Sequence, residues 1–219
     1  VKIHAVNNSW NKTLYSPYVN LLRTTTEAMA AALGGCNSMT ISPFDSAYAK
    51  PSEFSNRIAR NQQIILKVES YFDKIADPAG GSYYIENIAN SLITETWKMF
   101  CNIEEKGGFA KAMEEGFIRN EIEKTAHKRN NEIATRKVSI LGSNQYPDTN
   151  EKMAEKISED ILKPKGAYLK TYRGALPFEL IRYKTELFAK KTGKTPSVFL
   201  FTIGNNTMRK ARASFSFNF

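Results

Sequence analysis

The hydrophobic positions near the start of the chain form two short apolar runs, and each run precedes a helical pattern. Residues 2–6 and 37–41 have the length and composition of buried parallel strands. The segments that follow repeat apolar side chains at the spacing of one helix face. This order of strand, helix, strand and helix predicts a parallel α/β architecture.

Local signals mark the ends of these two helices. Thr24 and Glu27 have the capping-box spacing, so the first helix is predicted to begin near Thr24. Gly34 and Gly35 are predicted to end it, because glycine adopts the left-handed C-terminal conformation at low cost. The second helix is expected to begin after Ser52. Its apolar face comprises Phe54, Ile58, Ile65 and Leu66.

The remainder of the chain is predicted to be mostly helical. A sharp loop over 77–81 leads into a long helix, which Gly107 and Gly108 should stop. The apolar face of this helix consists of Ile85, Ile88, Ala89, Leu92, Trp97, Phe100 and Ile103. The later expected elements are a helix over 109–135, a strand over 138–142, a short helix over 151–162, an extended connector over 163–177, a helix over 178–192, a buried strand over 198–204 and a helix from Met208.

Composition and charge narrow the class of protein. The chain has 219 residues, of which 42% are hydrophobic and 24% charged, as in ordinary globular domains. It has no apolar run of about 18 residues, so no membrane-spanning helix is expected. The net charge of +9 is interspersed with acidic residues, as over 119–124, which favours solvated helix faces over a nucleic-acid site. Cys36 and Cys101 lack metal-ligand spacing, which favours a reduced, cytoplasmic setting.

Two long motifs connect the chain to a known family. They are the run from Leu22 to Gly35 (Leu-Arg-Thr-Thr-Thr-Glu-Ala-Met-Ala-Ala-Ala-Leu-Gly-Gly) and the run from Asp77 to Glu86 (Asp-Pro-Ala-Gly-Gly-Ser-Tyr-Tyr-Ile-Glu). With residues 55–62 and 107–109, they make the chain similar to the methylmalonyl-CoA mutase family over nearly all its length. In that family a (β/α)8 barrel binds an acyl-CoA, and a flavodoxin-like domain presses adenosylcobalamin against the barrel. The enzyme interconverts methylmalonyl-CoA and succinyl-CoA by a radical mechanism.

The resemblance implies an α/β fold with three parts. Residues 1–142 correspond to the last two β/α units of a TIM-type barrel and the helices that follow them. Residues 143–177 are expected to form a linker, and residues 178–219 the start of a degenerate, cobalamin-binding-like domain. A complete barrel takes about 250 residues, so the chain is expected to be a middle section of a longer polypeptide.

The positions at which the family holds its cofactor on the barrel side carry other residues here. Val6 stands where catalytic relatives have a glutamine, and Ser9 where they have a glycine that faces the corrin. Ser46 replaces a glutamate, whereas Ala49 matches a cofactor-lining alanine. His4 is retained, and a lone histidine favours a structural role.

The motif of the second domain is changed as well. Cobalamin-binding members have Asp-x-His-x-x-Gly, in which the imidazole ligates cobalt and the carboxylate orients it. The matching positions here are Asn206, Met208 and Ala211, and a methionine at this place favours packing over metal binding. We therefore expect no catalytic residue, no metal ligand and no bound cofactor in this chain.

The resemblance then implies the non-catalytic small subunit of such a mutase. The family includes heterodimers in which a homologous large subunit binds adenosylcobalamin and performs the reaction. The expected partner is that large subunit, with acyl-CoA bound only in the complex. Neither nucleic acid nor a membrane is an expected partner.

Three alternatives stay open. The first is a segment of a catalytically active, cobalamin-dependent acyl-CoA mutase. The second is a module for CoA or an acidic partner, with Asn37 and Ser38 at the place where the family approaches CoA. The third is a nucleic-acid binder, for which the sequence contains no motif.

Overall fold

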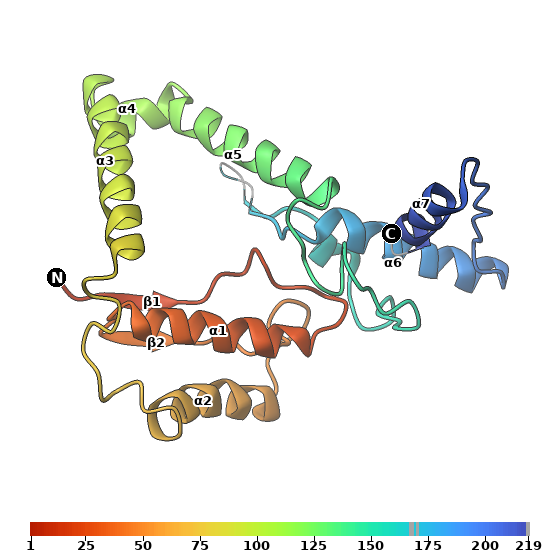
Figure 1. The fold of residues 1–219 in the computed structure, drawn as a ribbon, viewed down its shortest axis with the longest axis horizontal. Coiled ribbons are helices and arrows are strands. Elements are labelled where there is room, and N and C mark those ends of the chain that lie inside the picture. Colours follow the sequence, from red (N-terminus) through yellow and green to blue (C-terminus); the bar gives the residue numbers. More distant parts are fainter. Residues whose placement is uncertain (167–168, 170, 218–219) are drawn as a thin grey trace.

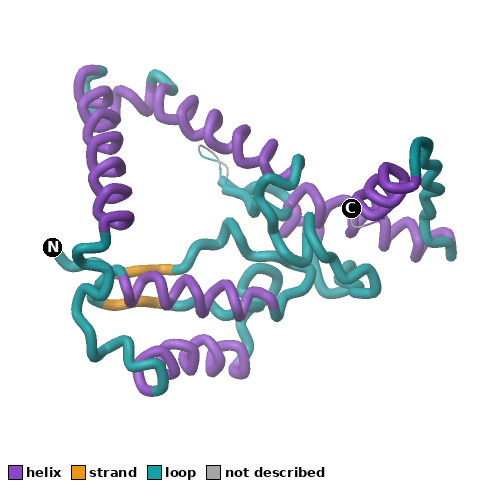
Figure 2. The backbone as a smooth tube through the Cα atoms, in the orientation of Figure 1, coloured by secondary structure: helices purple, strands orange, loops and turns teal. Residues whose placement is uncertain are grey.

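The computed structural model describes residues 1–166, 169 and 171–217. Figure 2 shows that the described chain consists of helices and long loops, apart from one pair of short strands. The strands and the first two helices form one body, from which the later helices extend in an open arrangement (Figure 1). Within this described part, no helix combines the length and apolar character needed to cross a membrane.

The N-terminal body has the predicted order of strand, helix, strand and helix. Strand β1 (His4–Val6) pairs in parallel with β2 (Ser38–Thr40). Helices α1 (Val19–Leu33) and α2 (Glu53–Val68) follow the strands and pack together. The strands are less covered than expected, since the side chain of Val6 is 64% exposed. The small core of this body consists of Ala28, Ile41, Ala59 and Leu66.

The predicted start of α1 is wrong. The helix begins at Val19, after a turn in which the backbone N–H of Asn20 donates to the carbonyl of Pro17. Thr24 therefore lies inside the helix, where its hydroxyl donates to the carbonyl of Asn20 at 2.9 Å. Glu27 has no capping role, because its carboxylate binds the side chain of Lys12. The C-terminal prediction is confirmed, since α1 ends at Leu33, before the two glycines.

A capping box does occur at α2. The Ser52 hydroxyl accepts from the backbone N–H of Ser55, and the Ser55 hydroxyl accepts from the N–H of Ser52. This arrangement satisfies N–H groups that have no partner within the helix. The predicted start of α2 after Ser52 is thus confirmed.

The long helix α3 (Tyr83–Glu105) has no buried residue. Its predicted apolar face points largely to solvent, and the Trp97 side chain is 65% exposed. The chain turns at Gly107 and Gly108, as predicted, and both have positive φ. The single helix expected over 109–135 is instead interrupted at Gly116, which has a φ of 78°. The two parts are α4 (Phe109–Glu114) and α5 (Phe117–Ala134).

The strand predicted over 138–142 is a turn built around Asn144. The Asn144 side chain accepts from the backbone N–H of Ile140 and donates to the carbonyls of Ile133 and Val138. Gly142 adopts a φ of 78°, which bends the chain away from a strand. Ile140 is nevertheless buried, beside Ile133 and Ala175.

The short helix predicted over 151–162 is mostly irregular. Only η1 (Glu159–Leu162), a 3₁₀ helix, forms there. The backbone N–H groups of Met153 and Ala154 donate to the Glu186 carboxylate, which takes the place of helical partners. The apolar side chains of this segment belong to a second core, which comprises Leu14, Tyr15, Met153, Ile157, Leu162 and Tyr183.

The C-terminal region contains α6 (Leu176–Thr192) and α7 (Asn206–Phe217), close to the helices expected there. The buried strand predicted over 198–204 does not form, and the Phe199 side chain is 89% exposed. A strand needs a neighbour for its backbone hydrogen bonds, and no described segment supplies one. The connector over 163–177 contains an antiparallel bridge between Lys165 and Thr171. Its residues 167, 168 and 170 lie outside the described residues.

Candidate functional site

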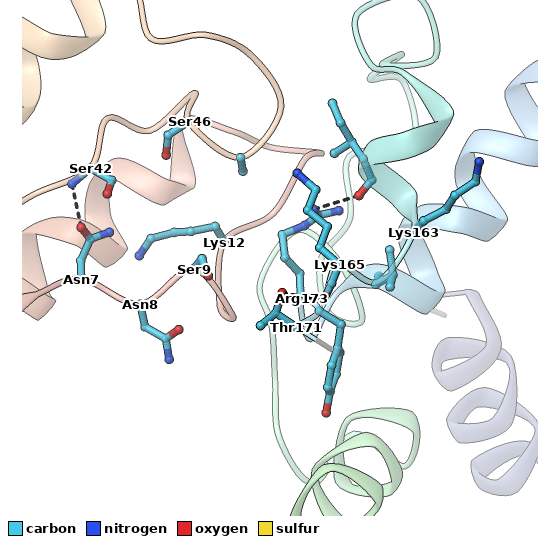
Figure 3. Close-up of a pocket in the computed structure, with 14 residues that line it drawn as sticks. Asn7, Asn8, Ser9, Lys12, Ser42, Ser46, Lys163, Lys165, Thr171 and Arg173 are labelled. Carbon is cyan, nitrogen blue, oxygen red and sulfur yellow. Dashed lines mark hydrogen bonds between the residues drawn. The ribbon is translucent and has the colours of Figure 1, made fainter. Parts of the chain in front are cut away.

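A cavity lies where the carboxyl ends of β1 and β2 meet the connector, and its lining is mostly polar residues together with Ala47, Ile161, Tyr172 and Leu176. Its volume is about 190 Å³. Asn7, Asn8 and Ser9 follow β1, whereas Ser42 and Ser46 follow β2. The carboxyl ends of parallel strands share one edge of a sheet, which brings these two loops together. The connector supplies the opposite wall, with Lys163, Lys165, Thr171 and Arg173 (Figure 3).

Hydrogen bonds between the two loops fix this edge. The Asn7 side chain accepts from the backbone N–H of Ser42 at 2.7 Å. The buried Asn20 amide donates to the carbonyls of Thr13 and Phe44, one in each loop. Through Asn20, helix α1 therefore fixes the loops that follow both strands.

His4 is bound to the neighbouring strand. Its Nδ1 lies 2.7 Å from the Ser38 hydroxyl, and its Nε2 lies 3.1 Å from the Thr40 hydroxyl. Both ring nitrogens are therefore engaged in the β1–β2 pair, which agrees with the structural role favoured from the sequence. His127, on α5, contacts Asn131 through Nε2.

Among the residues that the structure describes, four cationic side chains line the cavity, and three of them have a carboxylate partner. Lys12 Nζ lies 2.8 Å from the Glu27 carboxylate, Arg173 lies 2.6 Å from Glu179, and Lys163 lies 2.9 Å from Asp160. Figure 3 shows the amino group of Lys163 turned away from the other three cations. Lys165 has no carboxylate partner within the described part of the chain.

Burial affects the charge on Lys12. The side chain is almost fully covered, and this desolvation lowers the pKa of its amino group. The hydrogen bond and charge of Glu27 act in the opposite direction and favour the ammonium form. Burial likewise lowers the pKa of Arg23, which donates to the side chains of Thr13 and Asn20.

Of the four predicted barrel-side positions, the structure brings two to the cavity and leaves two outside it. Ser9 and Ser46 line the cavity. Val6 lies on β1, and Ala49 is exposed in the loop after β2; neither is among the residues that line it. The sequence pattern does not indicate Lys165 and Arg173 as site residues, because they come from a connector more than 100 positions away in the chain.

The predicted positions of the second motif all lie on α7, beyond α6 and away from β1 and β2 (Figure 1). The Met208 side chain is 46% exposed. Its backbone N–H donates to the Asn205 side chain, which begins the helix. Asn206, Met208 and Ala211 offer an amide, a thioether and a methyl group, and these do not supply an imidazole ligand with an orienting carboxylate. No group of three histidine, cysteine or acidic residues that could hold a metal occurs among the described residues.

The fold and the cavity define an α/β protein with its polar site at the carboxyl ends of parallel strands. Residues 1–175 match the family model of methylmalonyl-CoA mutase, and the chain belongs to this family.

Its relatives include the methylmalonyl-CoA mutase small subunits of Porphyromonas gingivalis and Streptomyces virginiae. The first is 46% identical over 99% of this chain and the second 34% identical over 98%, with 35% of each relative covered. The mitochondrial methylmalonyl-CoA mutase of Bos taurus is 40% identical over 73% of this chain and 21% of its own length. The chain thus spans about a third of the length of the small subunits it matches.

Proposed function

We propose that the chain is part of the non-catalytic small subunit of a methylmalonyl-CoA mutase. The main support for this proposal is the share of the chain that each alignment covers. The small subunits align over 98–99% of the chain, whereas the bovine enzyme aligns over 73%. The alignments with the small subunits thus include a part of the chain that the alignment with the bovine enzyme does not include.

The partner in this proposal is a homologous large subunit, in a heterodimer. That subunit binds adenosylcobalamin and interconverts methylmalonyl-CoA and succinyl-CoA, and acyl-CoA binds only in the complex. The residues at the family's cofactor positions support this division of labour. The hydroxyl of Ser46 stands in place of the carboxylate of cobalamin-binding members, and the thioether of Met208 stands in place of their imidazole.

The finer fold also belongs to the proposal. Residues 1–142 would form the C-terminal part of a TIM-type barrel and the helices that follow it. Residues 143–177 would form a linker, and residues 178–219 would form the start of a flavodoxin-like domain. The parallel pairing of β1 with β2 supports the barrel. The exposed apolar faces of α3 and of residues 198–203 support packing against further structure, since large apolar surfaces of this kind usually become covered.

The role of this chain would be to stabilise the complex. Segment 12–16 joins α1 to α6 through buried polar contacts, and this supports a firm scaffold. Obligate interfaces bury large apolar areas, for which the exposed face of α3 is suited.

The test is a titration of the complete subunit that contains residues 1–219 with adenosylcobalamin, followed by corrin absorbance. A catalytic mutase large subunit is the positive control. The proposal predicts a spectral change with the large subunit and none with the small subunit alone. A saturable spectral change with the small subunit alone would instead support a catalytically active cobalamin-dependent segment.

A further inference from the structure

We infer that the cavity between the strand ends and the connector is a binding site for a small phosphate-class anion. The inference concerns residues of this chain alone, so it is independent of the subunit assignment. It rests on three properties of the cavity: the sign of its charges, its free hydroxyl groups and its size.

The charges that face the cavity are positive. Among the described residues that line it, Lys12, Lys163, Lys165 and Arg173 are cationic, and none is acidic. The carboxylates of Glu27 and Glu179 contact Lys12 and Arg173 but are not among these lining residues. Lys165 retains an uncompensated charge within the described chain. Lysine binds phosphate as a mobile point charge, so Lys165 is suited to meet an anion that enters.

The cavity also offers neutral hydrogen-bond donors. The hydroxyl groups of Ser9, Ser42 and Ser46 line it, and within the described chain none of the three has a hydrogen-bond partner. They come from the loops after both strands, opposite the connector that carries Lys165 (Figure 3). A tetrahedral oxyanion accepts hydrogen bonds from several directions at once, whereas a neutral ligand would leave the charge of Lys165 unmatched.

The size of the cavity favours a small ligand. Its volume of about 190 Å³ lies below the range of roughly 300–1,000 Å³ that is typical of sites for drug-sized molecules. Free phosphate and the terminal phosphate of a nucleotide share the required chemistry. A whole corrin does not match a cavity of this size.

The experiment is calorimetric titration of the complete subunit with inorganic phosphate, ADP and succinate. Lys165→Gln removes the unpaired cation and should weaken phosphate binding by about 10-fold or more, as expected for a hydrogen bond to a charged group. Ser46→Ala removes one neutral donor and should weaken it by about 5-fold. Lys67→Gln is the matched control, because Lys67 is an exposed lysine on α2 outside the cavity and its loss changes net charge equally.

The comparison of ligands and of variants distinguishes the possible outcomes. Phosphate binding that is weakened by Lys165→Gln and unchanged by Lys67→Gln supports the inference. Tighter binding of ADP than of phosphate identifies a nucleotide as the source of the phosphate group, and equal binding identifies the free anion. The inference is overturned if phosphate does not bind at tens of millimolar, if succinate binds as tightly as phosphate, or if both lysine variants weaken binding equally.

Discussion

The backbone N–H of Leu14 donates to the carboxylate of Glu179 at 2.6 Å, across 165 positions of sequence. Glu179 is 1% exposed and also binds the guanidinium of Arg173. One carboxylate therefore connects the loop before α1, the start of α6 and the wall of the cavity. This contact makes the two halves of the described chain depend on each other.

The first prediction concerns this carboxylate. Glu179→Ala leaves the buried Leu14 N–H without its partner and the largely covered guanidinium of Arg173 without its carboxylate, and should lower the free energy of unfolding by about 3 kcal/mol or more. Urea unfolding of the complete subunit measures the change. Glu155→Ala, which removes a fully exposed partner of Lys190, should leave stability unchanged. Equal stability of Glu179→Ala and wild type would contradict the role of Glu179.

The second prediction concerns Tyr15 at alkaline pH. Its hydroxyl donates to Glu186 at 2.6 Å, and burial, together with this carboxylate, raises the pKa of Tyr15. An unfolded tyrosine loses its proton near pH 10, whereas the folded Tyr15 retains it, so stability should fall as the pH rises above about 10.

Tyr15→Phe should remove that part of the alkaline loss, at a cost of about 1 kcal/mol at neutral pH for the missing hydrogen bond. The measurement is the urea midpoint as a function of pH. Tyr71→Phe, at an exposed position, is the control and should behave as wild type. The same alkaline slope for Tyr15→Phe and wild type would show that Tyr15 does not titrate as proposed.

The third prediction concerns Lys12. Burial lowers its pKa, and Glu27 opposes that effect. Glu27→Gln removes the opposing charge and should destabilise the fold by about 2 kcal/mol at pH 7. Because the pKa of Lys12 in the folded variant then lies further below the unfolded value of about 10.4, the unfolded state binds more protons in that interval and stability rises with pH.

The deficit of Glu27→Gln relative to wild type should therefore shrink as the pH rises from about 7 toward the unfolded pKa of about 10.4. Thermal unfolding at pH values across this interval checks this. A deficit that stays constant or grows with pH would mean that Lys12 keeps its proton without Glu27.

The fourth prediction concerns the start of α2. Ser52→Ala removes the hydroxyl that accepts from Ser55, and should lower stability by about 1 kcal/mol. Ser52→Gly should lower it by only a few tenths of a kcal/mol, because glycine is a tolerated N-cap residue. Chemical unfolding of both variants distinguishes a capping role from a general effect of substitution, which would affect both alike.

Local signals predicted the elements whose causes are local. Ser52 precedes the start of α2, the two glycines after Leu33 end α1, and Gly107 and Gly108 form the turn that follows α3. The parallel order of the first two strands also follows from their own apolar pattern. By contrast, the Thr24–Glu27 spacing resembles a capping box but lies inside the helix, which begins after the turn at Pro17.

Other features depend on contacts that a sequence pattern does not contain. Residues 198–203 have the composition of a buried strand, but no described strand lies beside them. Residues 153 and 154 bond to Glu186 of α6, which prevents a regular helix. For the cavity, the sequence identified Ser9 and Ser46, whereas Lys165 and Arg173 reach it only through the path of the connector.

The most direct test of the subunit assignment is co-purification. The complete native polypeptide that contains residues 1–219 is tagged in its source cells, and the proteins retained in constant proportion are identified and quantified together with cobalamin. The account predicts a larger, homologous mutase chain in a one-to-one ratio, with the cobalamin bound to that chain. Recovery of the tagged chain without such a partner and with its own bound cobalamin would contradict it.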